Sequence, residues 1–548
     1  MKAIATALGV SEVWLAFGEI VGEGGESPPL PIDPILLTVD EMYQADALAV
    51  KAGISGLDLM EAAGAGIMQA IIARWPSSPV LVLCGPGNNG GDGFVVARLL
   101  REAGWDIRLA LLGNVEKLTG DAAVNAARWE GPVLEFKPGL VGKGENACGL
   151  VVDAVFGAGL SRPITGMVKT VLEEVAASGL PVIAVDVPSG IDGDTGACLG
   201  FALGAELTVT FFRRKPGHLL LPGRQHCGQV VVVDIGTPEA VLDQIRPQAH
   251  QNCPSLWGGL FPRRSVMDHK YVRGHVVVLG GDEMTGAARL AARGALRAGA
   301  GLVTIVCPES AVPIYALGEP GVLNARLGEG EGQGEGQREG LTRLLADERK
   351  NLYVLGPGNG VTAVTKARVM EVLETGRPCV LDADALTVFA DDVDGLAEAI
   401  SGPCVITPHE GEFARLFGPI GEGPKGERAG KLGRVRAAAA RLGCVVLLKG
   451  ADTVIADADG RGVINTNAPP ILATAGAGDV LAGFIGGLMA QSMSPFAAAC
   501  AGVWLHGECA NEFGPGLIAE DLPEQLPAVL RRLFSSTSDQ RLAVSVAP

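Results

Sequence analysis

Three polar clusters in the first half of the sequence each follow a run of apolar residues. They are GPGNNGGDG at 85–93, VDAVFGAGLSRP at 152–163 and DVPSGIDGDTG at 186–196. Asp153 and Asp186 lie where buried strands are expected to end. Burying a carboxylate costs free energy unless a cation, a base or a substrate compensates its charge. Three polar strand ends of one sheet converge on one crevice, so the pattern predicts a site with acid/base capacity. The structural alternative is that Asp186 caps the turn that follows it.

The first of these clusters joins an expected strand, 79–84, to an expected helix that begins near Phe94. Backbone N–H groups at such a helix start bind anions. The stretch formally matches G-x-G-x-x-G, but the next strand ends in Leu112 and Gly113, not in the acid that usually holds a ribose. An ordinary dinucleotide site is therefore disfavoured, and a turn with a helix cap is the structural alternative.

The strongest motif of the second half is ATAGAGDVLAGF at 473–484. A Gly-Ala-Gly-Asp turn at a helix start offers consecutive N–H groups to a developing negative charge. Asp479 lies in that first turn, where it is placed to take a proton from an attacking hydroxyl. Lys449 can serve as a counter-charge for phosphate, with a surface lysine at a strand end as the alternative. A histidine such as His409, taken alone, is more often structural.

The elements expected to position these residues are strands, read from short apolar runs, and helices, read from the Ala-, Leu- and Arg-rich runs between them. The expected strands of the first half are 79–84, 106–112, 149–156, 181–187 and 229–236. Those of the second half are 275–281, 301–307, 352–356, 378–384, 403–407 and 444–450. The β-branched runs are continuous, as expected when helices cover both faces of a sheet. Both halves are therefore predicted to be α/β with mostly parallel sheets and right-handed crossovers.

The length of 548 residues exceeds one compact core. A Pro- and Gly-rich stretch at 244–264 separates two long periodic regions and is interpreted as a linker. The expected domains are thus 36–243 and 265–540, with residues 1–35 as an extension. The low-complexity stretch at 328–340 is expected to be a solvated loop within the second domain.

The composition limits the function classes. The formal charge of −17 disfavours a nucleic-acid partner, which needs a basic face. The apolar segment 471–490 carries Asp479 and many glycines, so a buried loop and helix is expected there and no membrane partner. Eleven cysteines without paired spacing favour reduced thiols and a cytoplasmic location, and no structural zinc site is expected. The sequence leaves the oligomeric state open, a homo-oligomer included.

Taken in order and with their spacing, the three clusters of the first half resemble the NAD(P)HX epimerase family. The resemblance covers about residues 36–240 and implies a Rossmann-like three-layer fold and a bound potassium ion. It implies that Asn89, Asp153 and Ser189 hold potassium. It implies a substrate pocket formed by Asn88, Asn89, Gly90, Gly91, Asp92, Gly157, Ala158, Gly159, Leu160, Ser161, Arg162, Pro163 and Asp186, with Asp186 as the acid/base.

This sequence departs from the epimerase family at two positions. The family's usual Met-Glu-Asn-Ala-Gly reads Met60-Glu61-Ala62-Ala63-Gly64, and Ala158 stands where Thr is common. Both changes are expected to weaken the epimerase.

The motifs of the second half, over about 265–535, resemble the NAD(P)HX dehydratase family, which has a ribokinase-like fold. They are the stretch 269–303, GPGNG at 356–360, LDADAL at 381–386, TPHEGEFARL at 407–416, KGADT at 449–453 and the Gly-Ala-Gly-Asp turn. The resemblance implies substrate contacts from Ala287, Gly358, His409 and Asp479, with Asp479 as the base. It implies nucleotide contacts from Lys449, Gly450, Ala451, Asp452, Thr453, Gly476 and Gly478. Glu410 replaces a common Pro, and a mild effect is expected.

The resulting hypothesis is a bifunctional enzyme that repairs hydrated NADH and NADPH. The N-terminal half would interconvert the R and S epimers of the substrates NADHX and NADPHX. The C-terminal half would phosphorylate the S form with ADP or ATP and Mg²⁺ and eliminate phosphate. One alternative is a ribokinase-like small-molecule kinase with an accessory Rossmann-like binding domain, since sugar kinases also use Gly-Ala-Gly-Asp. Another is an N-terminal half that binds without catalysis.

Overall fold

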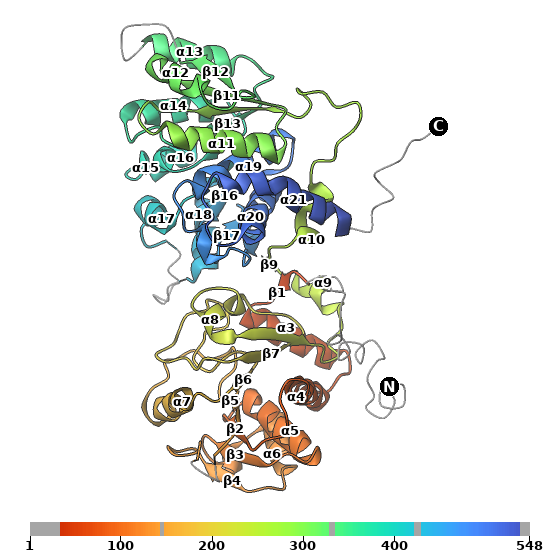
Figure 1. Ribbon diagram of the computed structural model, residues 1–548. Helices are drawn as coiled ribbons and strands as arrows, with labels where there is room; N and C mark the ends of the chain where they lie inside the picture. The colour runs from red at the N-terminus through yellow and green to blue at the C-terminus, as the bar shows by residue number, and fades with distance from the viewer. Residues whose placement is uncertain (1–32, 143–146, 328–334, 421–428, 537–548) are drawn as a thin grey trace.

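The computed structural model describes residues 33–142, 147–327, 335–420 and 429–536. Its two α/β halves each have their own sheet, and Figure 1 shows them one above the other along the long direction of the molecule. The extension before residue 33 and most of the low-complexity stretch at 328–340 lie outside the described residues.

The N-terminal half is built on a seven-stranded sheet whose strands are all parallel to their neighbours. In sheet order the strands are β4 (Val133–Glu135), β3 (Ile107–Leu111), β2 (Val80–Cys84), β5 (Leu150–Ala154), β6 (Val182–Val185), β7 (Leu207–Phe211) and β8 (Gln229–Val233). The strand order reverses between β2 and β5, and ligands of open parallel sheets bind outside the carboxyl ends of the strands at such a point.

Helices cover both faces of this sheet because successive residues of its central strands point to opposite sides. Val80 and Val82 belong to one core cluster and Leu81 and Leu83 to another. The helices are α3 (Val39–Lys51), α4 (Gly56–Ile72), α5 (Asn88–Glu102), α6 (Gly120–Ala127), α7 (Gly166–Ser178), α8 (Gly223–Cys227) and α9 (Val241–Ile245). Helices α4, α5 and α6 pack on the first face and α7 on the second.

The C-terminal half contains an eleven-stranded mixed sheet. In sheet order the strands are β1 (Ile35–Leu36), β9 (Ala249–Gln251), β18 (Gly462–Ile464), β17 (Val454–Ala456), β16 (Val445–Leu448), β15 (Cys404–Ile406), β14 (Cys379–Leu381), β13 (Leu352–Leu355), β10 (His275–Leu279), β11 (Leu302–Cys307) and β12 (Leu323–Arg326). The block from β16 to β12 is parallel throughout, which places the carboxyl ends of all these strands at one edge.

Two helical layers enclose this second sheet. One face carries α10 (Pro254–Trp257), α11 (Thr285–Ala298), α12 (Val312–Ala316), α19 (Ala477–Ala490), α20 (Pro495–Phe513) and α21 (Asp521–Ser536). The other face carries α13 (Glu335–Leu345), α14 (Ala363–Glu374), α15 (Asp384–Thr387), α16 (Val393–Ala399), α17 (Glu410–Phe417) and α18 (Lys431–Leu442). In the described part of the chain, no helix is long and apolar enough to cross a membrane.

The two halves are joined by more than a chain connection. The stretch 244–264, interpreted from sequence as a linker, contains β9, which pairs with β18 of the C-terminal half and with β1. Leu219 and Leu220, which follow β7 in the chain, lie in the same buried cluster as the second sheet's β16. The domain bounds drawn from the sequence stay a prediction.

The fold class and the strands expected from sequence are confirmed in both halves. One element differs in its start: α5 begins at Asn88, six residues before the expected helix start near Phe94. The residues Asn88 to Asp92 therefore form the first turn of a helix, and the glycine loop before it is only Gly85 to Gly87.

Candidate active sites

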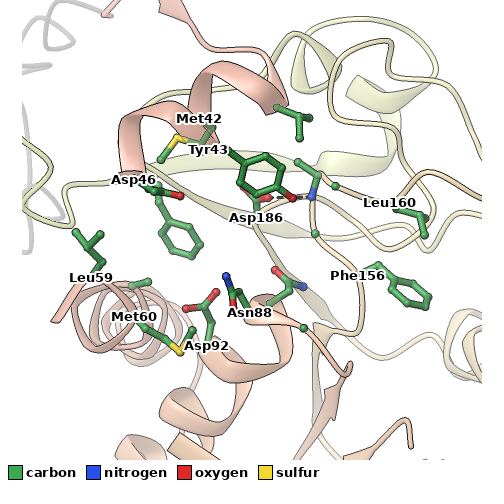
Figure 2. A pocket seen from close by; sticks show the side chains of 18 of the residues that line it. Met42, Tyr43, Asp46, Leu59, Met60, Asn88, Asp92, Phe156, Leu160 and Asp186 are labelled. Carbon is green, nitrogen blue, oxygen red and sulfur yellow. Dashed lines mark hydrogen bonds between the residues drawn. The ribbon is translucent and has the colours of Figure 1, made fainter. Parts of the chain in front are cut away.

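A cavity of about 690 Å³ opens at the carboxyl ends of the first sheet's central strands. It is lined from helices α3, α4 and α5, from the loop after β5, and by Asp186 directly after β6. Figure 2 shows the carboxylates of Asp46, Asp92 and Asp186 directed toward this space. Residues of all three sequence clusters line this cavity, although Asp153 itself is buried behind it and is not a lining residue.

Asp186 is the most heavily contacted carboxylate of the cavity. Its Oδ1 accepts hydrogen bonds from Thr210 Oγ1 at 3.0 Å and Lys215 Nζ at 2.6 Å. Its Oδ2 accepts one from the N–H of Ala158 at 2.9 Å. Asp186 also has a φ of 66°, an uncommon backbone conformation for a residue with a side chain. Burial opposes ionisation, but the Lys215 charge and these donors lower the pKa of Asp186 to about 2.

The partner lysine is held by the tight turn that follows β7. Lys215 is buried, with a side chain 2% exposed, and its backbone N–H donates to His218 Nδ1 at 2.9 Å. His218 Nε2 lies 2.8 Å from the backbone oxygen of Asp186. Burial and the neighbouring Lys215 lower the pKa of His218 to about 4, so this ring is neutral at pH 7. The turn therefore fixes one positive charge against Asp186.

In the first turn of α5, the polar residues face the cavity and the glycines face neighbouring backbone and side chains. Asn88, Asn89 and Asp92 line the cavity, whereas Gly90 and Gly91 do not. A Cβ on Gly90 would collide with the backbone oxygen of Gly85, and one on Gly91 would lie 2.7 Å from Met60 Sδ. The two glycines therefore allow α5 to pack closely, and the three polar residues face the substrate space.

The loop after β5 lines the opposite part of the cavity. Of its predicted substrate residues, Gly157, Ala158, Gly159, Leu160, Ser161 and Arg162 line the cavity and Pro163 does not. A Cβ on Gly157 would lie 2.9 Å from Asn89 Oδ1 and 3.1 Å from Asp186 Oδ2. Glycine at this position lets the loop approach both side chains.

Two of the three predicted potassium ligands, Asp153 and Ser189, are held against each other by β5 and the turn after β6, and the third, Asn89, lies in the first turn of α5. Asp153 is fully buried, and it accepts from Ser189 Oγ at 2.6 Å and from the Ser189 N–H at 2.8 Å. Burial raises the pKa of Asp153, and among the described residues it forms no ion pair. The amide nitrogen of Asn89 is buried without a hydrogen-bond partner. Buried oxygen donors around an uncompensated carboxylate fit a cation that prefers oxygen ligands.

Sequence reasoning missed two cavity residues of α3, Tyr43 and Asp46. This helix begins with a capping box, in which Thr38 Oγ1 accepts from the Glu41 N–H at 3.2 Å. Burial, followed by the charges of Asp186, Asp46 and Asp40, raises the pKa of Tyr43. The TVDE start is a helix signal, but no local pattern shows that this helix closes the cavity.

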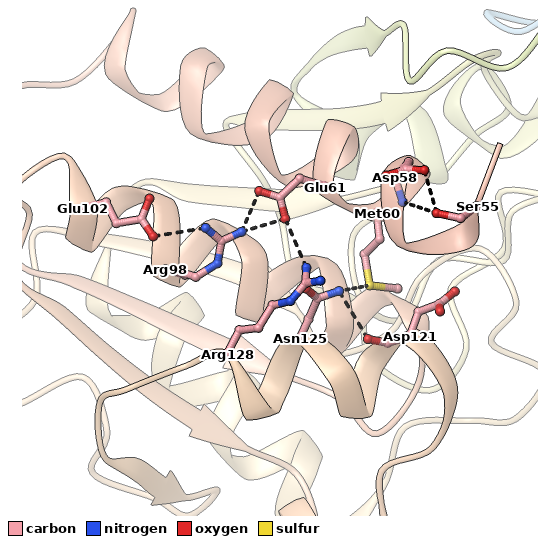
Figure 3. A network of polar contacts seen from close by, with 9 residues as sticks. All are labelled: Ser55, Asp58, Met60, Glu61, Arg98, Glu102, Asp121, Asn125 and Arg128. Atoms are coloured by element: carbon pink, nitrogen blue, oxygen red, sulfur yellow. Dashed lines mark hydrogen bonds and ion pairs between the residues drawn. The ribbon is translucent and has the colours of Figure 1, made fainter. Parts of the chain in front are cut away.

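The Met60-Glu61-Ala62 stretch acts mainly in helix packing (Figure 3). Met60 Sδ accepts from Asn125 Nδ2 at 3.1 Å, and Glu61 pairs with Arg98 of α5 at 2.6 Å. Met60 and Ala63 line the cavity, whereas Ala62 packs against the core on that side of the sheet. The substitution at position 62 is therefore separated from the cavity.

The second candidate site lies at the carboxyl ends of β10, β13, β14, β15 and β16, which are neighbours in the sheet. The predicted residues follow these strands one after another: Ala287 after β10, Gly358 after β13, His409 after β15 and Lys449 after β16. Gly358 has a φ of 67°, and its carbonyl oxygen lies against Gly281. The backbone N–H of Lys449 donates to the oxygen of Pro408 at 2.9 Å, which ties two of the motifs together.

Helix α19 adds Asp479 to this edge. Its N-cap is Gly476, with a φ of 87°, and Gly478 lies where a Cβ would be 3.4 Å from Lys449 Nζ. Burial is the main cause that raises the pKa of Asp479 to about 7, and the charge of Asp382 adds to it. A carboxyl group with this pKa is suited to accept a proton near neutral pH.

Asp382 is the residue of this site that sequence reasoning left without a role. It is 2% exposed, and its Oδ1 accepts from Lys449 Nζ at 2.6 Å. Burial lowers the pKa of Lys449, but the charge of Asp382 raises it by more, so the net change is an increase. The next residue, Ala383, has a φ of 49°. The motif LDADAL is a signal that could have indicated a strand-end carboxylate.

Two of the predicted residues have structural contacts of their own. His409 is the N-cap of α17, and its Nδ1 accepts from the Gly411 N–H at 2.9 Å. Asp452 is buried between Lys431 Nζ, at 2.7 Å, and the backbone N–H of Leu221, at 2.9 Å. Within the same motif, Thr453 Oγ1 donates to the oxygen of Gly450 at 2.7 Å.

Comparison with known proteins assigns both halves. Residues 56–217 match the family model of the YjeF-related protein N-terminus, and residues 276–529 match that of NAD(P)H-hydrate dehydratase. Over 529 residues the chain is 37% identical to the bifunctional NAD(P)H-hydrate repair enzyme of Moorella thermoacetica, covering 91% of this chain and 97% of that protein. The chain belongs to the bifunctional NAD(P)H-hydrate repair enzymes.

A second relative supports the same assignment. The enzyme of that name from Coxiella burnetii is 36% identical over 495 residues, covering 88% of this chain and 96% of the relative. An ADP/ATP-dependent NAD(P)H-hydrate dehydratase from Bacillus subtilis, solved with ATP and Mg²⁺, is similar at 29% identity and a TM-score of 0.43, covering 52% of this chain and 98% of that one. This repair enzyme thus combines an N-terminal epimerase half and a C-terminal dehydratase half, each an α/β domain with its own sheet, as expected from the motifs.

Proposed function

We propose that the cavity around Asp186 epimerises NADHX and NADPHX, and that the crevice around Asp479 dehydrates the S epimer with ADP or ATP. The observation that carries this proposal is that the chain holds two carboxylate centres, each at the carboxyl ends of parallel strands in a separate sheet. Each centre is formed by the motifs of one half. Because the centres belong to different sheets, both epimers can be used without contact between the sites.

In the dehydratase crevice, Asp479 accepts the proton of the substrate hydroxyl, whose oxygen attacks the terminal phosphorus of the nucleotide. The N–H groups at the start of α19 and the Lys449 ammonium stabilise the charge of the transferred phosphoryl group. Elimination of phosphate then restores the reduced nicotinamide. Ala287, Gly358 and His409 are proposed to contact the substrate, and residues 449–453 with Gly476 and Gly478 the nucleotide.

Mg²⁺ is proposed to enter with the nucleotide. The described residues contain no cluster of three or more His, Cys, Asp or Glu that could hold a metal ion. This fits Mg²⁺ sites in which substrate phosphates supply much of the coordination.

In the epimerase cavity, Asn89, Asp153 and Ser189 are proposed to hold K⁺. When bound there, K⁺ supplies a fixed positive charge beside the cavity. Asp186, fixed by Lys215, is proposed to act on the hydrated ring, which lies against the loop 157–162 and the first turn of α5.

We further propose that the enzyme works in the cytoplasm without a nucleic-acid or membrane partner. The formal charge of −17 opposes binding to phosphate backbones. All eleven cysteines are free thiols, which is typical of a reducing compartment.

The test follows the absorbance of reduced nicotinamide while purified protein acts on a mixture of both NADHX epimers with Mg²⁺, K⁺ and either ADP or ATP. Nucleotide-dependent recovery of NADH from both epimers is expected. Recovery that stops after one epimer would contradict the epimerase assignment. Accumulation of a phosphorylated product without NADH would contradict the dehydratase assignment and favour a kinase.

A further inference from the structure

Four carboxylates line the epimerase cavity: Asp121 of α6 and three others whose surroundings differ sharply. Asp46 comes from α3, Asp92 from the first turn of α5, and Asp186 from the strand end between them (Figure 2). Asp186 accepts three hydrogen bonds, one of them from Lys215. Within the described part of the chain, neither Asp46 nor Asp92 receives a hydrogen bond or an ion pair at its side chain. Among these three, one carboxylate is therefore saturated with hydrogen bonds and two are free.

A saturated carboxylate is a poor proton carrier. Lys215, acting against the effect of burial, lowers the pKa of Asp186 to about 2, so this carboxylate is ionised at neutral pH. Protonating it would also leave Lys215 buried without a counter-charge. Its effective contribution is a fixed negative charge, which stabilises positive charge that develops nearby.

The two free carboxylates have the opposite property. Burial raises the pKa of Asp46 to about 6; Lys215 lowers it in part and Asp186 raises it further. Burial raises the pKa of Asp92 well above its usual range, and the charges of Asp186 and Asp46 add to this. Neighbouring carboxyl groups with separated pKa values mark a division between proton transfer and charge stabilisation.

The chemistry of the substrate needs both functions. Water that adds to an enamine-like ring places its hydroxyl on a carbon bonded to the ring nitrogen. To invert this carbon, an acid protonates the hydroxyl, the C–O bond breaks with its electrons on oxygen, and the nitrogen lone pair forms a C=N⁺ bond. A second water molecule then adds to the other face and gives up one proton to a base. No oxidant or reductant is required, and the proton count is unchanged.

We propose that Asp46 and Asp92 are paired proton carriers that act on opposite faces of the hydrated ring, while Asp186 stabilises the cationic ring between them. This inference rests on the proposed epimerase function of the cavity. Asp46 protonates the hydroxyl of one epimer as Asp92 accepts the proton of the incoming water, and the roles exchange in the reverse direction. Helices α3 and α5 approach the cavity from opposite sides, which suits the two faces of one ring (Figure 2).

The remaining charged or titratable lining residues do not offer a competing pair. They are Tyr43, Arg162, Lys215 and the one remaining carboxylate, Asp121, which lies on α6 beside Gly56 at the start of α4. Lys215 is committed to Asp186, and the pKa of Tyr43 is raised from an already high value by burial and by three acids. Tyr43 and Arg162 are therefore assigned to binding, not to proton transfer.

The test uses the full-length enzyme without nucleotide, with each purified NADHX epimer separately, in water enriched in ¹⁸O. Chromatography measures inversion and mass spectrometry measures exchange of the hydroxyl oxygen, both corrected for the uncatalysed rates. The variants are Asp46→Asn and Asp92→Asn. The control is Asp40→Asn, which makes the same change at an exposed position of α3 outside the cavity. Dehydratase activity, measured on the S epimer, reports whether each variant is folded.

Wild-type enzyme is expected to invert and exchange both epimers. Asp46→Asn and Asp92→Asn should each lose inversion by about 100-fold or more, because a general acid or base is removed. Each should still exchange oxygen with one epimer, and the two variants should retain opposite epimers, since each keeps the carboxylate on one face.

Three results would overturn the pairing: inversion at the wild-type rate in either variant, retention of the same epimer by both variants, or loss of exchange with both epimers in one variant. A wild-type enzyme that inverts neither epimer would instead reject the epimerase function itself.

Discussion

The two candidate active sites place a lysine beside a carboxylate in different ways. In the epimerase cavity, Lys215 pairs directly with Asp186 at 2.6 Å, and the pKa of Asp186 falls to about 2 despite burial. In the dehydratase crevice, Lys449 pairs with Asp382 at 2.6 Å, and Asp479 is left with a pKa raised to about 7 by burial and by Asp382. Lys215 thus keeps Asp186 ionised. Lys449 pairs with Asp382 instead, which leaves Asp479 free to exchange a proton.

This contrast shows that a strand-end carboxylate does not by itself define a catalytic role. Both sites lie at the carboxyl ends of parallel strands, and both contain a residue other than glycine with positive φ, Asp186 at 66° and Ala383 at 49°. The role follows from which carboxylate receives the counter-charge. Replacing each carboxylate in turn is the strongest test of this difference in roles.

The largest effect is expected from Asp479→Asn, because it removes the only group assigned to accept the hydroxyl proton. Dehydratase kcat should fall by about 10³-fold or more, within the range for combined proton transfer and positioning, while epimerisation is unchanged. NADH recovery from the S epimer measures the first activity, and chromatographic inversion measures the second. Asp394→Asn, at a side chain 80% exposed on the same half, is the control. A variant with normal NADH recovery would remove Asp479 from the mechanism.

The next effect is expected from Asp186→Asn. Loss of its fixed charge should slow epimerisation by about 10²- to 10³-fold, the usual effect of removing one preorganised electrostatic group. The dehydratase should be unaffected because its site belongs to the other sheet. Exposed Asp106, changed to Asn, is the matched control. An inversion rate equal to that of the control would show that the cavity only binds.

The pH dependence of the two activities distinguishes these roles without any substitution. Asp479 acts as a base, so dehydratase kcat/KM should rise about tenfold per unit as pH increases toward its pKa of about 7, then level off. Asp46 acts in its protonated form on the epimer whose hydroxyl it protonates, so inversion of that epimer should fall as pH rises above about 6. Besides burial, the charges of Asp382, Lys449 and Asp384 shift the pKa of Asp479 in the dehydratase half. The charges of Lys215 and Asp186 shift the pKa of Asp46 in the epimerase half. Parallel pH profiles for the two activities would contradict the division of roles.

A smaller effect concerns the contact between the halves. Asp452→Ala removes the acceptor shared by Lys431 and by the N–H of Leu221, which lies on the same turn as Lys215. An unpaired buried donor costs about 1–3 kcal/mol, so amide exchange of residues 215–224 should accelerate by about 5- to 150-fold. Hydrogen–deuterium exchange with mass spectrometry measures this, with the neighbouring exposed Asp459→Ala as control. Unchanged protection would mean that the turn is held by Leu219 and Leu220 alone.

The sequence predicts the sheets and the strand-end residues because these signals are local. Continuous β-branched runs indicate strands covered on both faces, and the polar residues that follow them must meet at one edge of a parallel sheet. The positions of Asp153 and Asp186 as strand-end carboxylates follow from this pattern, whereas the site roles of Lys449 and His409 rest mainly on the resemblance to the dehydratase family.

The remaining features depend on contacts between distant segments. Asp46 lies in a helix with an ordinary capping signal, and only tertiary packing turns it toward the cavity. Lys215 reaches Asp186 across 29 positions of the chain. The three-residue strand β9 lies in a Pro-rich stretch too short for alternation to be visible, so it was interpreted as part of a linker. Pairing partners, unlike strand periodicity, have no local signature.

The smallest effect is expected at the two positions where the chain departs from its family. Ala62 packs against the core of helices α4, α5 and α6 and does not line the cavity, whereas Ala158 contacts Asp186 through its backbone N–H, at 2.9 Å. A backbone donor is the same in alanine and threonine, so neither substitution removes a contact that the described cavity uses. Ala62→Asn and Ala158→Thr should therefore leave epimerase kcat/KM unchanged, as measured by chromatographic inversion beside wild type. A large gain in either variant would show that a side chain at that position reaches the substrate, and that the weakening expected from sequence is real.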